Sequence, residues 1–217
     1  MSIIFNKGIA FICEGDTEKE FYLSLLGFLC TKHNAVLDKI HLPEEAEIAY
    51  KISTEKTTYL VKFHTVNAIT ALPRANKWFN VECIKKYPRN KEWIVFLCYD
   101  TDNYKAEITP FYEGDWKELR SKLKKAREII DLAASADIED IFLFDIDGIC
   151  AFLHCPVVSI DTLHGRKGTA KIKELYRNNG SCYHKGTRAR PMIDSLDKQR
   201  IMDSCPIPLN KIERLFE

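Results

Sequence analysis

Acidic side chains follow three of the apolar runs in this sequence, each at the point where a strand would end. In an open parallel sheet, ligands bind just outside the carboxyl ends of the strands, so acids in these places can meet at one site. Carboxylates held close together repel one another unless a cation neutralises them, and Mg²⁺ or Mn²⁺ suits a set of oxygen ligands. The acids concerned are Glu14, Asp100, Asp102, Glu139 and Asp140.

Asp100 and Asp102 are separated by one residue, so in an extended segment their side chains leave on the same face. A further carboxylate group nearby permits two ions, one that activates water and one that stabilises the leaving oxygen. The alternative is that each acid forms a turn or caps a helix, because Asp accepts hydrogen bonds from local backbone N–H groups. The order of the acids along the chain, rather than any single acid, favours the metal site.

The elements that would position the first acid are a strand, a tight turn and a helix. Gly8 to Cys13 is a continuous apolar run, typical of a strand that is buried on both faces, and Glu14-Gly15-Asp16 interrupts it. Thr17 is the predicted N-cap of the following helix, with Glu20 as its capping-box partner. The apolar periodicity of this helix continues to about His33.

The rest of the chain continues the alternation of strands and helices. This pattern predicts an α/β fold with a mainly parallel, Rossmann-like sheet and helices on both faces. We expect a catalytic domain over residues 1–155, with a β-rich insertion at about 36–66, and a small basic appendage over 156–217. The further predicted strands are 47–53, 57–66, 92–99 and 129–134, and the further predicted helices are 68–87 (interrupted near Pro73), 116–128 and 138–153.

The composition is that of an ordinary globular protein, with 217 residues, 46% hydrophobic and 29% charged. The 32 basic and 31 acidic residues leave a net charge of +1, so nucleic-acid binding would need a local basic patch. The eight cysteines form no C-x-x-C pair and are expected to be reduced. Because we find neither a signal peptide nor an apolar run of about 18 residues, we expect a cytoplasmic protein without a membrane span.

A basic segment from Lys185 to Arg190 stands out against the neutral charge of the whole chain. A Lys or Arg beside a carboxylate–metal site would bind a phosphate and stabilise the charge that develops in the transition state. Lys185 is the first candidate for this catalytic role and Arg188 the second. The alternative is a solvated basic loop, because short charge runs usually have no specific role.

Two segments resemble the Toprim domain, in which a strand ends in Glu-Gly and a later strand ends in Asp-x-Asp. These segments are FICEGDTEKEFY (11–22) and VFLCYDTD (95–102). The Glu-Gly-x-Thr-Glu form looks most like the branch of the overcoming-lysogenization-defect (OLD) and RloB-like nucleases. SADIEDIFLFDI (135–146) is similar to the Ser-led acidic helix of that branch, so the resemblance covers roughly residues 8–150.

The resemblance implies that Glu14, Asp100 and Asp102 bind the metal, and that Glu18 with Glu139 or Asp140 completes a second site. It implies a Mg²⁺- or Mn²⁺-dependent phosphodiesterase with one or two ions, that is, a nuclease acting on RNA, such as tRNA, or on DNA. The expected role is that of an effector in bacterial anti-phage defence. The alternative is a non-catalytic Toprim-like module that binds nucleic acid or a partner protein.

The chain contains no G-x-x-x-x-G-K-[ST] segment, so an ATPase would have to be a separate chain. The expected partners are therefore a nucleic-acid substrate and an ATPase, a reverse transcriptase or another protein of the defence system. A homodimer is also expected, because relatives in that branch often pair.

Overall fold

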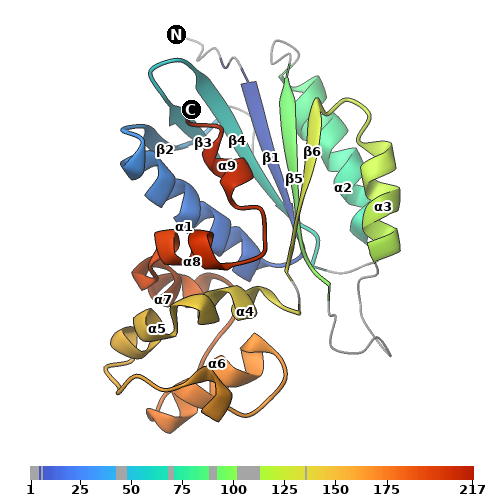
Figure 1. The fold of residues 1–217 in the computed structure, drawn as a ribbon. Coiled ribbons are helices and arrows are strands. Elements are labelled where there is room, and N and C mark those ends of the chain that lie inside the picture. The colour runs from blue at the N-terminus through green and yellow to red at the C-terminus, as the bar shows by residue number, and fades with distance from the viewer. Residues whose placement is uncertain are drawn as a thin grey trace.

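The computed structural model describes residues 5, 7–42, 48–67, 71–87, 92–101, 113–134 and 136–217. Its centre is a six-stranded sheet with the order β2-β3-β4-β1-β5-β6 (Figure 1). Strands β4, β1, β5 and β6 are parallel, and β3 is antiparallel to both β4 and β2. The strands are β1 (Lys7–Cys13), β2 (Val36–Ile40), β3 (Ala49–Ser53), β4 (Thr58–Thr65), β5 (Trp93–Asp100) and β6 (Glu128–Ala134).

The alternation of side chains along β1 divides the interior into two hydrophobic clusters. Ile9 and Phe11 belong to the cluster on one face of the sheet, and Ala10 and Ile12 belong to the cluster on the other face. Both faces of this strand are therefore buried, as its continuous apolar run predicts. The mixed α/β fold with a largely parallel, Rossmann-like sheet and helices on both faces confirms the predicted fold class.

The two faces carry different numbers of helices (Figure 1). On the first face, α1 (Asp16–Lys32) lies against the sheet, and the helices of the second half of the chain pack against α1 and below it. These helices are α4 (Ile138–Phe142), α5 (Ile146–Phe152), α6 (Gly168–Asn178), α7 (Arg190–Ser195), α8 (Lys198–Ser204) and α9 (Asn210–Glu213).

The second face is covered by α2 (Leu72–Trp78), its continuation as a π-helix over Phe79–Lys85, and α3 (Glu113–Lys122). Pro73 lies in the first turn of α2, where its missing N–H is not needed, so it begins the helix instead of interrupting it. The predicted helix over 116–128 is too long, because α3 ends at Lys122 and Glu128 already belongs to β6. Trp116 is fully buried under this face.

Two details of the predicted helices are wrong. Helix α1 begins at Asp16 with Gly15 as its N-cap, and no side chain caps it, so Thr17 and Glu20 do not form a capping box. The predicted helix over 138–153 is divided into α4, a 3₁₀ turn at Leu143–Asp145, and α5. The break occurs where the Asp145 side chain accepts a hydrogen bond from the backbone N–H of Gly148 and so begins a new helix.

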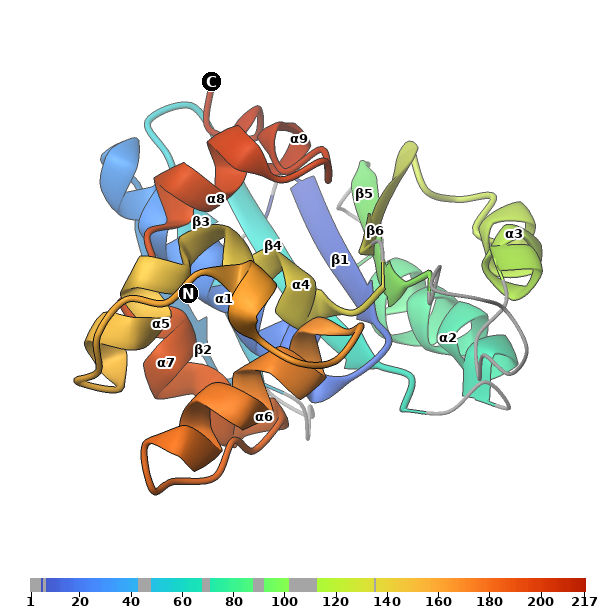
Figure 2. The same ribbon diagram turned by 60° about the horizontal axis from the view of Figure 1, so that its bottom comes forward.

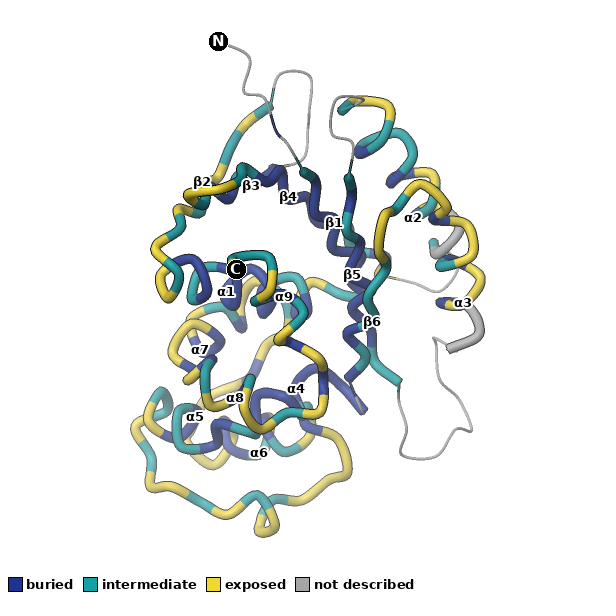
Figure 3. Tube along the Cα trace, turned by 45° about the horizontal axis from the view of Figure 1, so that its top comes forward, coloured by how far each residue is buried: buried dark blue, intermediate teal, exposed yellow. Residues whose placement is uncertain are grey.

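Segments 36–66 and 156–217 are both integrated into the main structure. Strand β4 lies beside β1 in the centre of the sheet, and α6 to α9 contribute to the same hydrophobic cluster as α1. Figure 3 shows the central strands β4, β1 and β5 as mostly buried, whereas the long connection below α5 and α6 is mostly exposed. Within the described residues, no helix has the length and apolar character that a membrane crossing requires.

Candidate functional site

The first two acids are held together at the carboxyl ends of neighbouring strands. β1 and β5 pair in register at Cys13 and Cys98, and the backbone N–H of Glu14 donates to the Cys98 carbonyl at 2.8 Å. The Glu14 carboxylate accepts a hydrogen bond from the backbone N–H of Asp100 at 2.9 Å. The Glu14 side chain therefore bridges the two strand ends. Asp102, the other half of the Asp-x-Asp pair, lies outside the described residues.

Glu18, in the first turn of α1, folds back over the turn that follows β1. A Cβ placed on Gly15 would lie 2.9 Å from the Glu18 Oε2, so glycine makes room for this carboxylate. The Glu18 side chain is only 5% exposed. It is therefore a buried acid at the strand ends and not part of a solvated helical turn.

The N-terminus of α4 brings a second group of acids to the same end of the sheet, which faces the viewer in Figure 2. Asp137 is the N-cap of α4, and its side chain and that of Asp140 accept hydrogen bonds from each other's backbone N–H groups. This capping box fixes the direction of the first turn. Glu139, between them, is completely buried.

Glu139 accepts three hydrogen bonds from side chains that come from the C-terminal half of the chain. Its Oε1 accepts from the Tyr183 hydroxyl at 3.0 Å, and its Oε2 lies 3.1 Å from the Lys185 Nζ. The Thr169 hydroxyl lies 2.9 Å from the same Oε2 and 2.7 Å from Asp137 Oδ2. A hydroxyl has one proton to donate, so Thr169 can serve only one of these two carboxylates at a time.

Close contact between α4 and α6 makes this arrangement possible. A Cβ placed on Gly168 would lie 2.2 Å from the backbone nitrogen of Asp140, so only glycine allows the two helices to approach. Asp137 also accepts a hydrogen bond from the backbone N–H of Thr169 at 3.2 Å. One buried carboxylate therefore receives backbone N–H groups from the first turns of both helices.

The two predicted basic residues have different surroundings. Lys185 is half-exposed and forms an ion pair with Glu139 at 3.1 Å. Gly186, in the left-handed conformation with φ +70°, donates its N–H to the Thr17 hydroxyl at 2.9 Å and so anchors this loop to α1. Arg188 is exposed and makes no hydrogen bond or ion pair with any described residue. The structure thus brings Lys185, but not Arg188, to the acidic cluster.

The acids at the strand ends resist ionisation. Burial raises the pKa of Asp100 well above its usual value, and the negative charges of Glu18 and Glu14 raise it further. Burial also raises the pKa of Glu18 from 4.5 to about 7, with the charge of Glu139 adding to the effect. Burial lowers the pKa of Lys185, but its attraction to Glu139 outweighs this and the pKa of this lysine is raised. The raised pKa values of Asp100, Glu18 and Lys185 are those expected where carboxylates outnumber positive groups.

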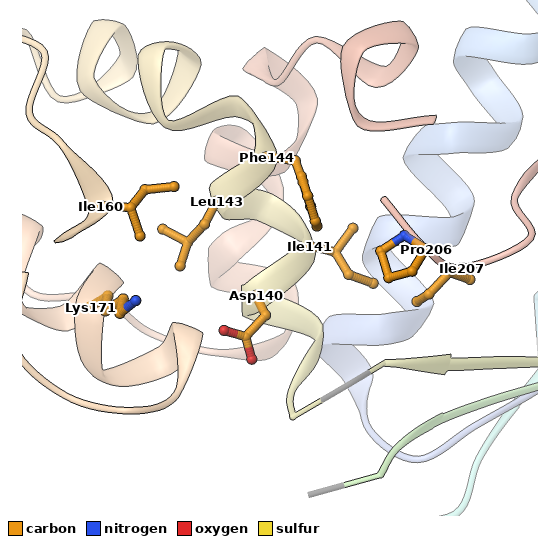
Figure 4. A pocket seen from close by; sticks show the side chains of 8 residues that line it. All are labelled: Asp140, Ile141, Leu143, Phe144, Ile160, Lys171, Pro206 and Ile207. Carbon is orange, nitrogen blue, oxygen red and sulfur yellow. The ribbon is translucent and has the colours of Figure 1, made fainter. Parts of the chain in front are cut away.

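Asp140 differs from Glu139 although the two are adjacent. Burial raises the pKa of Asp140 to about 6, the charge of Asp137 adds to this, and the charge of Lys171 opposes it. Figure 4 shows the Asp140 carboxylate beside an apolar pocket that the α4 helix and Lys171 help to form. Of the two acids that the sequence leaves as alternatives, Glu139 lies in the cluster and Asp140 lies beside the pocket.

We define the acidic cluster by its four described carboxylates: Glu14, Glu18, Asp100 and Glu139. Asp100 Oδ1 is a buried oxygen without a hydrogen-bond partner among the described residues. A buried polar atom of this kind costs free energy unless a further group satisfies it. No group of three or more His, Cys, Asp or Glu side chains in the described parts of the chain has the arrangement that would hold a metal ion by itself.

Several residues of the site were not predicted from the sequence. For Asp137 a signal exists, because an Asp three residues before Asp140 and just ahead of an apolar segment has the spacing of a helix cap. The other three contribute hydroxyl groups from distant segments, and no local pattern marks them. These are Thr17, Thr169 and Tyr183.

Comparisons with known proteins give only remote similarities. No family model matches the chain, and a search of curated proteins finds no match either. The solved structures include a Campylobacter jejuni 5′-methylthioadenosine/S-adenosyl homocysteine nucleosidase at 12% identity and a TM-score of 0.26, covering 61% of this chain and 66% of the nucleosidase. A mutant of Helicobacter pylori futalosine hydrolase has 7% identity and a TM-score of 0.28, covering 92% of this chain and 100% of the hydrolase.

These findings contradict the Toprim prediction, which is wrong. No Toprim model matches, and the similar solved structures are nucleosidases and a futalosine hydrolase instead of OLD or RloB-like nucleases. The predicted phosphodiesterase activity on RNA or DNA and the role in anti-phage defence are withdrawn with it, and the non-catalytic Toprim-like module fits no better. TM-scores of 0.25 to 0.28 carry no argument about the activity of this chain. The expected ATPase, reverse-transcriptase and homodimer partners stay predictions.

Proposed function

We propose that the acidic cluster binds a divalent cation, Mg²⁺ or Mn²⁺, and that the protein uses this ion to activate water for a hydrolytic reaction. Phosphodiester cleavage is not part of the function we propose. The observation that carries the proposal is the buried Oδ1 of Asp100, which has no hydrogen-bond partner among the described residues, in a cluster whose charge is mostly negative. A cation would give this oxygen a partner and would offset the negative charge of the cluster.

The donor set suits a hard cation. Glu14, Glu18 and Asp100 supply only carboxylate oxygens, which Mg²⁺ and Mn²⁺ prefer over nitrogen or sulfur. A cation bound at carboxylates lowers the pKa of a water molecule on it and so supplies hydroxide near neutral pH. We expect Asp102 to join these ligands, since it follows Asp100 by two residues.

Glu139 and Lys185 have a supporting role in this proposal. Tyr183, Thr169 and Lys185 already engage both oxygens of Glu139, so this carboxylate is held in one orientation. Partners of this kind orient a metal-binding carboxylate and tune its affinity. Lys185 is half-exposed, and its ammonium group also offers a positive charge to a substrate that approaches the cluster.

A second candidate is an acid–base site that works without a metal. A carboxyl group whose pKa is close to 7 can both donate and accept a proton at neutral pH, and burial places Glu18 in this range. The absence of a ready group of three ligands among the described residues also favours this candidate. The negative charge of the acidic cluster can be offset either by a proton on Glu18 or by a bound cation, and the two candidates differ in this respect.

Calorimetric titration with Mn²⁺ tests the proposal directly. We expect the wild-type protein to bind Mn²⁺ with a Kd below about 1 mM, and Asp100→Asn to weaken binding by about 100-fold, because one ligand loses its charge. Asp38→Asn is the matched control, since this exposed acid on β2 pairs with Lys51 far from the cluster. Its affinity should equal that of the wild type.

The same titration decides between the two candidates. The cation proposal is wrong if neither Mn²⁺ nor Mg²⁺ binds at a concentration of roughly 5 mM, which is about fivefold above the highest Kd that we expect. Carboxyl NMR would then have to show Glu18 titrating near pH 7 for the acid–base site to stand. If Mn²⁺ binds equally well to Asp100→Asn and to the wild type, the ion lies elsewhere and the proposal also fails.

We also propose that the protein works in the cytoplasm. Cys13 and Cys98 lie side by side on the neighbouring strands β1 and β5, and they form no disulfide with each other. Thiols that stay reduced are typical of a reducing compartment.

A further inference from the structure

A pocket of about 320 Å³ lies beside α4 (Figure 4). Its walls come from α4 and the 3₁₀ turn that follows, from the 3₁₀ turn at Ile160–Thr162, from α6, and from the connection between α8 and α9. Small-molecule sites usually have volumes of about 300–1,000 Å³ and mainly apolar walls. The apolar lining residues are Ile141, Leu143, Phe144, Ile160, Pro206 and Ile207.

Two charged side chains of opposite sign also line the pocket, and within the described residues they form no hydrogen bond or ion pair with each other. Asp140 uses one carboxylate oxygen to accept the N–H of Asp137 at 3.1 Å, and its other oxygen accepts no hydrogen bond from the described residues. Lys171, on α6, forms no hydrogen bond or ion pair with the described part of the chain. The positive charge of Lys171 partly offsets the effect of burial on the pKa of Asp140, but the two groups make no direct contact that would prevent either from binding a ligand.

We propose that this pocket binds a small zwitterion with an apolar body, of the class of the apolar α-amino acids. The ligand's ammonium group would donate to Asp140, its carboxylate would accept from Lys171, and its side chain would fill the apolar part of the pocket. A purely apolar ligand would leave both charges without partners, and a ligand with a single charge would leave one. The volume limits the ligand to a free amino acid or a molecule of similar size and excludes a folded peptide segment.

The position of the pocket makes it independent of the cation proposed for the acidic cluster. Glu139 and Asp140 are neighbours on α4, but the first contacts Tyr183 and Lys185 and the second faces the pocket. Loss of Mn²⁺ binding would leave the pocket unchanged. Conversely, a failure of the pocket to bind an amino acid would not affect the cation site.

Three probes of nearly equal size test the proposal: L-phenylalanine, phenethylamine, which lacks the carboxylate, and 3-phenylpropionate, which lacks the ammonium group. Binding is followed in the full-length protein by NMR of ¹³C-labelled isoleucine methyl groups. The methyl groups of Ile141, Ile160 and Ile207 should shift on titration, while those of Ile9 and Ile12 in the sheet should not. We expect L-phenylalanine to bind at least tenfold more tightly than either of the other probes.

Lys171→Met identifies the contact with the carboxylate, and the variant is expected to fold because the Lys171 side chain is only partly buried. It should weaken L-phenylalanine binding at least tenfold and leave phenethylamine binding unchanged. Lys173→Met, two residues along α6 at an exposed position, is the matched control and should bind like the wild type. The proposal is overturned if the methyl signals of Ile141, Ile160 and Ile207 all stay in place when L-phenylalanine is added to about 10 mM. This concentration is roughly ten times the Kd of a weakly bound ligand, about 1 mM. Equal affinity for all three probes would overturn it as well.

Discussion

Two buried charged regions, one on a face of the sheet and one at the carboxyl ends of its strands, differ in how completely their charges are paired. On the face covered by α2 and the π-helix, Lys62 is 1% exposed. Its Nζ donates to the Glu82 carbonyl at 3.0 Å, lies 3.7 Å from the Glu82 carboxylate, and lies 5.3 Å from the centre of the Tyr87 ring. At the carboxyl ends of the strands, several buried carboxylates share the positive charge of Lys185.

The charge of Lys62 has a structural role, whereas the charge of Asp100 has the features of a functional site. Lys62 sits among an acceptor, a carboxylate and an aromatic face, so its burial is compensated within the protein. Asp100 has a buried oxygen without a hydrogen-bond partner in the described part of the chain, and its pKa is raised because burial and neighbouring acids oppose its ionisation. A protein keeps such an uncompensated group at a cost in stability, and that cost is typical of functional sites.

The largest expected effect is a gain in stability when one of the surplus charges is removed. Glu18→Gln should raise the free energy of unfolding by about 3 kcal/mol at pH 8 to 9 in the absence of divalent ions, since one unit of pKa shift corresponds to about 1.4 kcal/mol. Burial raises the folded-state pKa of Glu18 to about 7 from 4.5. Between these values the folded state holds the proton more tightly, so wild-type stability falls as the pH rises through this window.

Urea unfolding of both proteins between about pH 3.5 and pH 9 measures this difference. The two curves should converge toward about pH 3.5, one unit below the ordinary pKa of 4.5, because Glu18 is then mostly protonated in both states, and they should diverge up to about pH 8. Glu118→Gln is the control, because this exposed glutamate on α3 forms a surface ion pair with Lys122 and its replacement should change stability little. A constant difference between wild type and Glu18→Gln at every pH would refute the assignment.

The opposite result is expected at the compensated charge. Lys62→Met keeps the length and apolar stem of the side chain but removes the hydrogen bond and the ion pair to Glu82. We expect a loss of about 2 kcal/mol in the free energy of unfolding, because the Glu82 carbonyl would be left without its buried donor. Denaturant unfolding measures this loss.

Lys39→Met is the matched control for Lys62→Met. Lys39 is an exposed residue of β2, so its replacement should change the free energy of unfolding by less than about 0.5 kcal/mol. If Lys62→Met proves as stable as the control, Lys62 contributes no more than an exposed lysine. The contrast between the compensated charge of Lys62 and the uncompensated charge of the acidic cluster would then be lost.

The strands and the first acids could be predicted because local patterns determine them. Continuous apolar runs mark β1 and β5, and the turn residues after them place Glu14 and Asp100 at the strand ends. The Toprim assignment went further than two short motifs allow and was wrong. A pair of acids at strand ends is compatible with many activities, so it predicts a site better than it predicts a family.

The rest of the site depends on contacts between residues that are distant in the sequence. Thr17 has the type and place of a helix cap, yet its hydroxyl accepts the N–H of Gly186, 169 residues away. Tyr183 and Thr169 reach Glu139 only after α6 packs against α4. The local sequence pattern does not predict these contacts, because each of the two partners lies in a segment that forms its own helix or turn without the other.

The smallest expected effect concerns the hydroxyl that links the two acids of α4. Thr169→Val keeps the shape of the side chain and the backbone N–H bound by Asp137, but it removes the hydroxyl near Asp137 and Glu139. We expect stability to fall by about 1 kcal/mol, and Mn²⁺ affinity to fall by about tenfold because Glu139 loses one of the groups that orient it.

Thr169→Ser restores the hydroxyl without the methyl group and should recover most of the Mn²⁺ affinity. Thr31→Val is the control, since Thr31 is exposed on α1 and donates only to the Gly27 carbonyl, so it should leave Mn²⁺ binding unchanged. A role in packing alone would make Thr169→Ser less stable than Thr169→Val and would leave the Mn²⁺ affinity of both variants equal to that of the wild type. If Thr169 orients Glu139, Mn²⁺ affinity should be high in Thr169→Ser, which keeps the hydroxyl, and low in Thr169→Val, which lacks it, whatever the stability of each variant. The reason is that the Thr169 hydroxyl is the group that contacts Glu139.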